Sequence, residues 1–485
     1  MSKTSFDYKL MLEINTEFIP SDSQLNYLAE SMAVEPKEIP AGYTYLGQFI
    51  DHDISFDSSS RTPPWEPLPQ CVFNQRTPFL NLETIYGFQC PSNPDEPTRA
   101  QLLKDGSNTL LRLGDTINDG SVSRVFTDKD LPRKPNSPHA FIVDPRNDEN
   151  LAVAQTQVAF MRFHNAVVKH LKAQDTPKTF EEARKIVIQH YQWIILKDYL
   201  PQIIKKSVLN DVLNEGNNFY FPNPKTPYVP LEFSVAAFRL GHSMIRNSYN
   251  WNRIFNDDPS VSNDEKATIY KLIEFTGNGG LGKRTKLLSD WLINWNWFYD
   301  VAGSVQNQKF NSALPIDTKF ALLLGFLPDN QSITPGNFRR ESSLPAFDLY
   351  RTRAFGLPTG QEAAKIILGT EQRVLKPEQI ANLLPSNLKY MFSKETPLFF
   401  YLLAEAEIEE HGQNLGEVGS RIIAETLIEL IKLSEYSILA DDFKPIPEFS
   451  NSKEEFGMAE MLKFIRTVEG FQNFDPLNPL EDEDL

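Results

Sequence analysis

The chain has 485 residues, of which 41% are hydrophobic and 23% are charged, a composition that excludes an intrinsically disordered protein. Its formal net charge of -16 disfavours a nucleic-acid partner, because phosphate binding needs a basic surface patch. No apolar run reaches the ~18 residues that a membrane-spanning helix requires, so we expect no transmembrane segment.

The first residues lack the basic and apolar regions of a signal peptide, and only two cysteines, Cys71 and Cys90, are present. Two cysteines are too few for a disulfide framework in a chain of this length. We therefore expect a cytoplasmic protein by default, with secretion by a leaderless route as the alternative.

The first informative segment is residues 47–56, where His52 stands between Asp51 and Asp53 in a chain with only 7 histidines. On a helix, Gln48 lies one turn before His52, so the amide and the imidazole share one face. An imidazole near an amide suits proton transfer at neutral pH, because its ordinary pKa is close to that pH. The alternative is an ordinary Asp-His-Asp cluster at the end of a surface helix.

Helical periodicity dominates after residue 150, and strand-like alternation is scarce, which predicts a mainly α fold. The expected helices cover residues 151–171, 180–200, 233–245, 396–409 and 418–433. A shorter helical pattern near residues 459–465 either packs on the body or forms a contact surface. The acidic tail 481–485 is expected to be solvated.

The predicted helix 233–245 carries the second notable histidine, His242, directly after Gly241. The glycine would let a flat group approach closely, so the segment is a candidate wall of a haem pocket. An axial histidine needs one ring nitrogen aimed at the iron and the other held by an acceptor. The alternative is a core histidine bonded to a backbone carbonyl.

Together these segments resemble the peroxidase-cyclooxygenase superfamily, also called animal haem peroxidases. The distal motif of that family reads Gly-Gln-x-x-Asp-His-Asp, as at residues 47–53, and the proximal motif reads Phe-Arg-x-Gly-His, as at 238–242. Five further segments match in the same order: residues 77–83, 86–87, 144–149, 344–351 and 353–358. The style is that of leaderless bacterial members.

The resemblance implies one large helical haem peroxidase domain over residues 40–435, with little β structure. Residues 1–39 would be an N-terminal extension. Residues 436–485 would be a C-terminal extension with an acidic tail.

The resemblance also implies a haem-dependent peroxidase that uses hydrogen peroxide and passes through a ferryl intermediate. His52 would be the distal acid and base, moving a proton from the oxygen nearest the iron to the leaving oxygen. Arg146 would stabilise the charge on the departing oxygen, and Gln48 would orient a water or a halide. The alternative for Arg146 is a solvated arginine in a Pro-Arg turn.

Six residues would hold haem b. His242 would be the axial ligand, and Asp348 stands where many relatives place an asparagine that accepts the proton of the axial imidazole. Arg239 and Arg351 would bind haem propionates, with helix-surface ion pairs as the alternative. Asp51 and Glu149 match positions that form ester bonds to haem in many relatives.

The resemblance further implies a calcium site near the distal helix, with a changed ligand pattern. Its expected ligands are Asp53, Thr77, Phe79, Asn81 and Glu83, where relatives present aspartate and serine at the last two positions. All are oxygen donors of the kind that Ca²⁺ prefers. The alternative is a hydrogen-bonded loop without metal.

We expect organic donors or the anions iodide, thiocyanate and bromide as substrates, and a role in the response to oxidative stress. The carboxylate of Asp348 should lower the reduction potential and so favour these donors over chloride. One alternative is a fatty-acid dioxygenase or cyclooxygenase, although Arg239 replaces the radical-forming tyrosine of those enzymes. Another is a non-catalytic haem- or calcium-binding interaction protein. The oligomeric state stays open.

Overall fold

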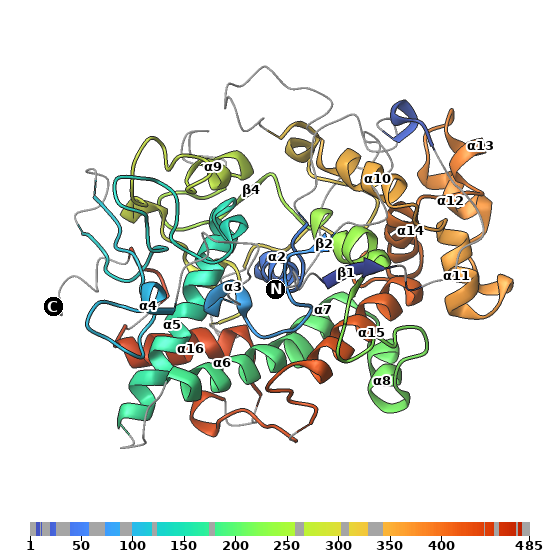
Figure 1. Cartoon of the computed structure of the whole chain (residues 1–485). Coiled ribbons are helices and arrows are strands. Elements are labelled where there is room, and N and C mark those ends of the chain that lie inside the picture. Colours follow the sequence, from blue (N-terminus) through green and yellow to red (C-terminus); the bar gives the residue numbers. More distant parts are fainter. Residues whose placement is uncertain are drawn as a thin grey trace.

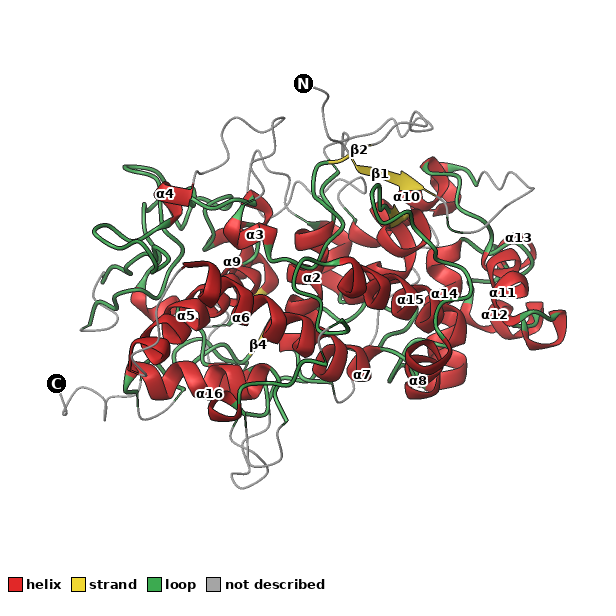
Figure 2. Ribbon diagram, turned by 60° about the horizontal axis from the view of Figure 1, so that its bottom comes forward, coloured by secondary structure: helices red, strands yellow, loops and turns green. Residues whose placement is uncertain are grey.

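The structure is a computed structural model of the chain. It describes residues 6–9, 11, 20–25, 39–57, 73–87, 99–118, 124–173, 180–257, 266–301, 310–327, 343–440, 442–450, 455–471 and 474–477. The two cysteines and the acidic tail 481–485 lie outside these residues. The predicted mainly α fold is confirmed, since helices dominate both views of the described chain (Figures 1 and 2).

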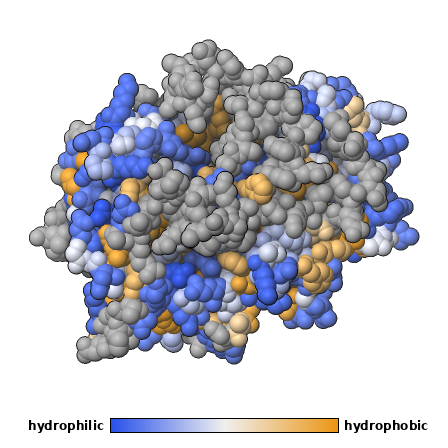
Figure 3. Space-filling model, in the orientation of Figure 1, coloured by the Kyte–Doolittle hydropathy of each residue, from blue (hydrophilic) through white to orange (hydrophobic). Residues whose placement is uncertain are grey.

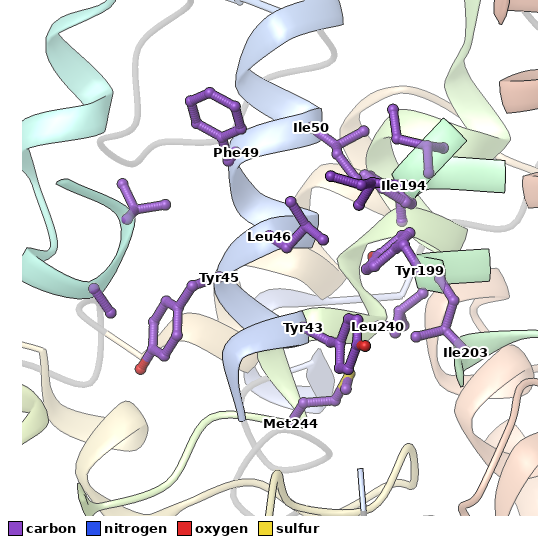
Figure 4. Close-up of a cluster of buried hydrophobic side chains, with 14 of the residues drawn as sticks. Tyr43, Tyr45, Leu46, Phe49, Ile50, Ile194, Tyr199, Ile203, Leu240 and Met244 are labelled. Atoms are coloured by element: carbon purple, nitrogen blue, oxygen red, sulfur yellow. The ribbon is translucent and has the colours of Figure 1, made fainter. Parts of the chain in front are cut away.

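Helix α2 (Gly42–Ile54) runs through the middle of the molecule and is buried along almost its whole length (Figure 1). Its apolar side chains, among them Leu46 and Ile50, pack between neighbouring helices (Figure 4). Glycine permits this burial, because a Cβ atom at Gly47 would overlap the hydroxyl of Tyr199. Residues at the end of α2 are therefore held in a water-poor interior.

Two long helices cover one side of α2: α5 (Leu151–Ala173) and α6 (Phe180–Ile194), the latter continued by the π turn Ile195–Tyr199 and by α7 (Leu200–Ile203). The ring of Phe49 stacks on Phe160 at 5.1 Å, and Tyr191 meets both rings edge-on. Such aromatic contacts fix the angle between α2 and α5. The predicted helices 151–171 and 180–200 correspond to these elements.

The other side is built from one helix of the N-terminal half, α8 (Lys206–Glu215), and from helices of the C-terminal half of the chain (Figure 2). The latter helices are α10 (Leu344–Ala354), α11 (Gly360–Leu368), α12 (Pro377–Leu383), α13 (Lys389–Phe392), α14 (Leu398–Glu410) and α15 (Glu417–Leu433). Three short helices lie nearer the N-terminal half: α3 (Glu83–Tyr86), α4 (Arg99–Leu102) and α9 (Ile269–Glu274).

The segment predicted as a regular helix over 233–245 differs from that expectation. It consists of a π turn, η3 (Glu232–Ala236), followed by a 3-10 turn, η4 (Ala237–His242). The backbone of Ala236 leaves the helical region between them, at φ -123° and ψ -71°. The wider π turn brings residues five apart together, so that Phe233 stacks on Phe238 at 4.5 Å. This aromatic stacking accompanies the loss of α geometry.

The strands are short. β1 (Phe6–Lys9) pairs with β2 (Phe73–Asn74) in antiparallel and with β3 (Val229–Pro230) in parallel orientation. β4 (Ser248–Tyr249) pairs with β5 (Ala267–Thr268) in antiparallel orientation.

Helix α16 (Met458–Glu469) packs against α5 (Figure 1). Phe464 meets Phe163 edge-on, and Glu469 accepts hydrogen bonds from Arg162 at 2.6 and 3.0 Å and from Lys129 at 2.8 Å. We call Glu469, Arg162 and Lys129 the α16 clasp. The sequence left open whether this segment packs on the body or forms a contact surface, and in the structure it packs on the body.

A pocket lies beside the α16 clasp, and it contains none of the predicted site residues. It is lined in part by Phe126, Trp295, Arg466 and Phe471.

On the face shown in Figure 3, hydrophilic residues predominate among those described and hydrophobic ones are scattered between them. Within the described part of the chain, no helix is long and apolar enough to cross a membrane.

Candidate functional site

His52 lies in the last turn of α2 and is only 6% exposed. Its Nδ1 atom is 2.6 Å from Oδ1 of Asn147, which belongs to the 3-10 turn η1 (Pro145–Asp148). Burial lowers the pKa of His52 to about 4, with a further contribution from the nearby charge of Arg146. The ring is therefore neutral at pH 7 and able to accept a proton.

Asn147 is a site residue that the sequence did not reveal. Its Nδ2 donates to Oγ1 of Thr84 and to Oε1 of Gln157, both at 2.6 Å, and all three side chains are buried. The only available signal was the place of Asn147 between Arg146 and Glu149 in a motif. Nothing in that motif indicates a contact across 95 residues of sequence.

The structure brings Arg146 to the end of α2. Its guanidinium donates to the carbonyls of His52, at 3.0 Å, and Ser55, at 2.6 Å, and to the carboxylate of Asp144. The same carboxylate accepts from Arg76, at 2.9 Å. Burial alone would raise the pKa of Asp144, but the two arginines hold it well below its usual range. Two cations, Arg76 and Arg146, therefore share this one carboxylate close to His52.

Asp51, the residue before His52, is buried and paired. Its carboxylate accepts from the hydroxyl of Ser55 at 2.9 Å and lies 3.4 Å from the guanidinium of Arg239. Burial would raise the pKa of Asp51, but the charge of Arg239 and other nearby groups lower it below its ordinary value. Gln48 lies one turn earlier on α2 and is half-buried, on the face that it shares with His52.

His242 ends the 3-10 turn η4, and its Nδ1 is 2.7 Å from Oδ2 of Asp348 on α10. Asp348 is 3% exposed, whereas a quarter of the His242 side chain is accessible. Among the described residues, Nε2 of His242 has no hydrogen-bond partner. The two residues that the resemblance implies as axial ligand and acceptor are therefore together, with the outer ring nitrogen available for a ligand.

Arg239 and Arg351 both face carboxylates of the chain. Arg239 donates to the carbonyl of Ser234 at 2.7 Å besides its contact with Asp51. Arg351 pairs with Asp57 and lies over the ring of Phe355. Glu149 is half-buried and follows the end of η1. Haem propionates would have to compete with these carboxylates for the two guanidiniums.

Four of the five expected calcium ligands make hydrogen bonds with other residues of the chain. Both oxygens of Asp53 accept backbone N–H groups, from Leu82 at 3.0 Å and Thr84 at 3.2 Å, and Glu83 accepts from the hydroxyl and the N–H of Thr77. Asn81 accepts from the backbone of Glu435 at 3.3 Å.

The two carboxylates among these residues, Asp53 on α2 and Glu83 at the start of α3, are buried. Burial raises the pKa of Asp53 to about 7 and that of Glu83 to about 8. Oxygen-rich groups with a costly buried charge fit a cation, although the described residues contain no cluster of three or more acidic, histidine or cysteine ligands. Phe79 lies between these two residues in the chain and is partly exposed.

The residues at the two imidazoles fit a haem. His242 has the bonded Nδ1 that an axial ligand needs and a side chain that is partly accessible, and among the described residues the nearest atom to a Cβ at Gly241 would be the carbonyl oxygen of Thr44, at 3.9 Å. His52 supplies a second, buried imidazole on the neighbouring helix. In this arrangement the charges of Arg239 and Arg351 are already balanced by Asp51 and Asp57.

The profile of the animal haem peroxidase family matches residues 58–276. A peroxidase-like protein of Margaritifera margaritifera is 26% identical over 208 residues, which is 41% of this chain and 25% of that protein. Thyroid peroxidase of Rattus norvegicus is 29% identical over 191 residues, which is 36% of this chain and 20% of the relative. The chain thus matches about a quarter or less of the length of these relatives.

Solved structures share the fold over nearly the whole chain. Peroxidase A from Dictyostelium discoideum superposes with a TM-score of 0.58 at 16% identity, covering 97% of this chain and 95% of that one. The fatty acid alpha-dioxygenase of Oryza sativa gives a TM-score of 0.57 at 15% identity, covering 94% and 78%. At these identities the likeness concerns the fold alone.

Proposed function

We propose that the chain, which belongs to the peroxidase-cyclooxygenase superfamily, is a haem-dependent peroxidase that reduces hydrogen peroxide at the expense of a small electron donor. One observation carries the proposal: two imidazoles from neighbouring helices each have Nδ1 held by a side-chain oxygen, His52 by Asn147 and His242 by Asp348. This leaves both Nε2 atoms for chemistry.

Bound haem would supply a redox-active iron that stores the two oxidising equivalents of the peroxide. His242 would hold that iron through Nε2. His52 would accept the proton of hydrogen peroxide at Nε2 and return it to the other oxygen, which leaves as water. With two further protons and two electrons from the donor, one peroxide then yields two molecules of water.

Arg146 supports this proton transfer through its charge. The pair Arg76 and Arg146 keeps one positive charge in excess of Asp144 within a buried region, where electrostatic interactions are little screened. This charge would stabilise the departing oxygen, while Gln48 would orient a water or a halide. Because Arg146 donates to the carbonyls of His52 and Ser55, it also holds the end of α2 in place.

The partner of His242 bears on the choice of donor. An ionised carboxylate pulls more strongly on the imidazole proton than an amide would, which makes the ligand more electron-rich and lowers the reduction potential of the iron. We therefore propose iodide, thiocyanate, bromide or phenols as donors in preference to chloride. We also propose ester links from Asp51 and Glu149 to the haem, which would oppose this effect. A Ca²⁺ ion beside Asp53 at the end of α2 is a further part of the proposal.

The test uses haem-loaded protein and its visible spectrum before and after addition of hydrogen peroxide. We expect a change of the Soret band with peroxide, its reversal by a donor, and faster turnover of iodide or a phenol than of chloride. His242→Ala should remove the axial coordination spectrum. Protein that takes up no haem, or a spectrum unaffected by His242→Ala, would contradict the proposal.

A fatty-acid dioxygenase is the second candidate, favoured by the fold shared with the rice enzyme. Against it, Arg239 occupies the position of the radical-forming tyrosine and pairs with Asp51. Oxygen uptake with a long-chain fatty acid separates the two, since a peroxidase consumes peroxide and needs no molecular oxygen. A third reading, a non-catalytic binding protein, predicts haem uptake without oxidation of any donor.

A further inference from the structure

The contact between His52 and Asn147 belongs to a buried network whose members each have a defined role as donor or acceptor. Asn147 and Thr84 are fully buried, and Gln157 is 1% exposed. In this environment an unmade hydrogen bond is costly, so the polar atoms have to be matched donor to acceptor.

The neighbours of Asn147 determine which side of its amide carries the nitrogen and which carries the oxygen. Its nitrogen has two hydrogens and two acceptors, Oγ1 of Thr84 and Oε1 of Gln157. The orientation of Gln157 is fixed in turn, because its own amide nitrogen faces the sulfur of Met161 at 3.8 Å. The oxygen of Asn147 is therefore the atom that faces His52, and an amide oxygen has no proton to give.

From this network we infer that Asn147 is a positioning residue that fixes His52 as the tautomer with its proton on Nδ1. A bond of 2.6 Å between Nδ1 and an amide oxygen requires the hydrogen to be on the ring. Nε2 then carries the lone pair, which is the form that can take a proton from hydrogen peroxide. The catalytic purpose of this arrangement rests on the proposed peroxidase function, whereas the tautomer itself does not.

The position of Asn147 is also held by the backbone. Pro145 begins η1, and the carboxylate of Asp144 caps it by accepting the N–H of Arg146 at 3.0 Å. Thr84 is attached to α2 as well, because its N–H donates to Asp53. The network therefore connects the end of α2, η1, α3 and α5, and it leaves the ring of His52 little freedom to turn.

The reversed network is the competing arrangement. Both amides would have to turn, so that Asn147 donates to Nδ1 and Gln157 presents its oxygen to the sulfur of Met161. His52 would then carry its proton on Nε2 and could not act as a base at that atom. The two arrangements differ in one observable, the ring nitrogen that carries the proton.

The experiment measures that observable in full-length, haem-free protein with ¹⁵N in the histidine rings. Long-range proton–nitrogen correlation spectra distinguish the two tautomers, and the His52→Gln variant identifies the His52 signals among the 7 histidines. We expect protonation on Nδ1 in the unsubstituted protein. Protonation on Nε2 there overturns the inference without any need for a variant.

Variants then test whether Asn147 is the cause. In Asn147→Ala the ring should shift towards the Nε2-protonated form that free histidine favours, whereas Asn147→Asp retains an acceptor and should keep Nδ1 protonated. The matched control is Asn150→Ala, since Asn150 is also buried but caps the start of α5 by accepting the N–H of Ala152 at 2.9 Å. An unchanged tautomer in Asn147→Ala contradicts the inference.

The haem-loaded protein supplies a second readout. The rate of reaction with peroxide should fall about 10- to 100-fold in Asn147→Ala, the scale expected when the group that orients a functional imidazole is lost, and should recover in Asn147→Asp. Protein with the expected tautomer but no reaction with peroxide would contradict the proposed function and leave the inference standing. Full activity with His52 protonated on Nε2 would contradict the inference and leave the proposed function standing.

Discussion

The carboxylate of Asp348 lies 2.7 Å from Nδ1 of His242, across 106 residues of sequence. Asp348 is nearly fully buried and accepts a hydrogen bond from the ring of His242, whose side chain is partly accessible. The pair therefore sets the electron density that His242 can offer to a metal.

Replacing Asp348 by asparagine should raise the ferric/ferrous potential of the haem-loaded protein. A neutral acceptor pulls less on the imidazole proton and stabilises ferric iron less, so we expect a rise of at least about 60 mV, equivalent to tenfold in the equilibrium constant. Spectroelectrochemical titration of both proteins measures the change. A potential within error of the original would show that the carboxylate does not control the iron.

His52→Gln should slow the reaction with peroxide about 10²- to 10⁴-fold, because the proton acceptor is lost while the axial ligand is kept. Stopped-flow absorbance measures the rate. His164→Gln is the matched control, since His164 is equally buried but bonds to Tyr86 and to the carbonyl of Thr109. Equal losses in the two variants would indicate a structural effect of removing a buried histidine.

The α16 clasp should make the stability of the protein depend on acid pH. The charges of Arg162 and Lys129 outweigh burial and lower the pKa of Glu469 to about 2. A carboxyl whose folded pKa is lowered stabilises the fold above its unfolded pKa, near 4.5, and this contribution is lost as the pH falls towards 2. The shift of Glu469 alone corresponds to about 3 kcal/mol at neutral pH, and burial, which lowers the pKa of Lys129 to about 7, offsets part of it.

Thermal unfolding of the original protein and Glu469→Gln at pH 7, 4.5 and 3 tests this dependence. The difference in melting temperature should be largest at pH 7 and should shrink below pH 4.5. Glu460→Gln is the control on the same helix, because its pair with the half-exposed Lys463 should contribute less than about 1 kcal/mol. A difference that does not change with pH would assign the effect of Glu469 to packing.

Ca²⁺ should raise the melting temperature of the protein, and a chelator should reverse the effect. A ligand that binds the folded state at 100 times its dissociation constant stabilises by about 2.7 kcal/mol. Asp53→Asn should abolish the response, and Asn81→Asp, which adds a carboxylate, should strengthen it. An equal response in Asp53→Asn would show that any bound ion occupies another site.

Peroxide treatment should attach the haem covalently. Asp51 is held by Ser55 and Arg239, and the charge of Arg239 favours its ionised form. This carboxylate is the group that would react with a haem methyl group. After denaturation in acidified organic solvent, the haem should stay with the polypeptide, and it should become extractable in a variant with both Asp51→Asn and Glu149→Gln. Complete extraction from the original protein would reject the ester bonds.

The sequence predicted the elements that depend on local pattern. Apolar spacing located the helices α5, α14 and α15, although burial in them is not confined to one face: all residues 398–406 of α14 are buried. It failed at residues 233–245, where stacking of Phe233 on Phe238 replaces the α geometry by a π turn and a 3-10 turn. The apolar pattern of that segment is the same in both cases, so periodicity cannot separate them.

The sequence did not predict the contacts between distant segments. Motifs pointed to His52 and Arg146 individually, but Asn147 gained its role only through the folding of η1 against α2. Glu469 likewise meets Lys129 across 340 residues. Hydrogen bonds of this kind depend on where the fold places two distant segments. A single sequence contains little information about that placement.

The position of α16 has a practical consequence for truncation. A shortened protein that stops at residue 435 would leave the ring of Phe163 facing water and would deprive Lys129 and Arg162 of their shared counter-ion. Such a fragment should aggregate on expression even though every residue assigned to catalysis is retained in it. Its loss of solubility would then say nothing about its chemistry.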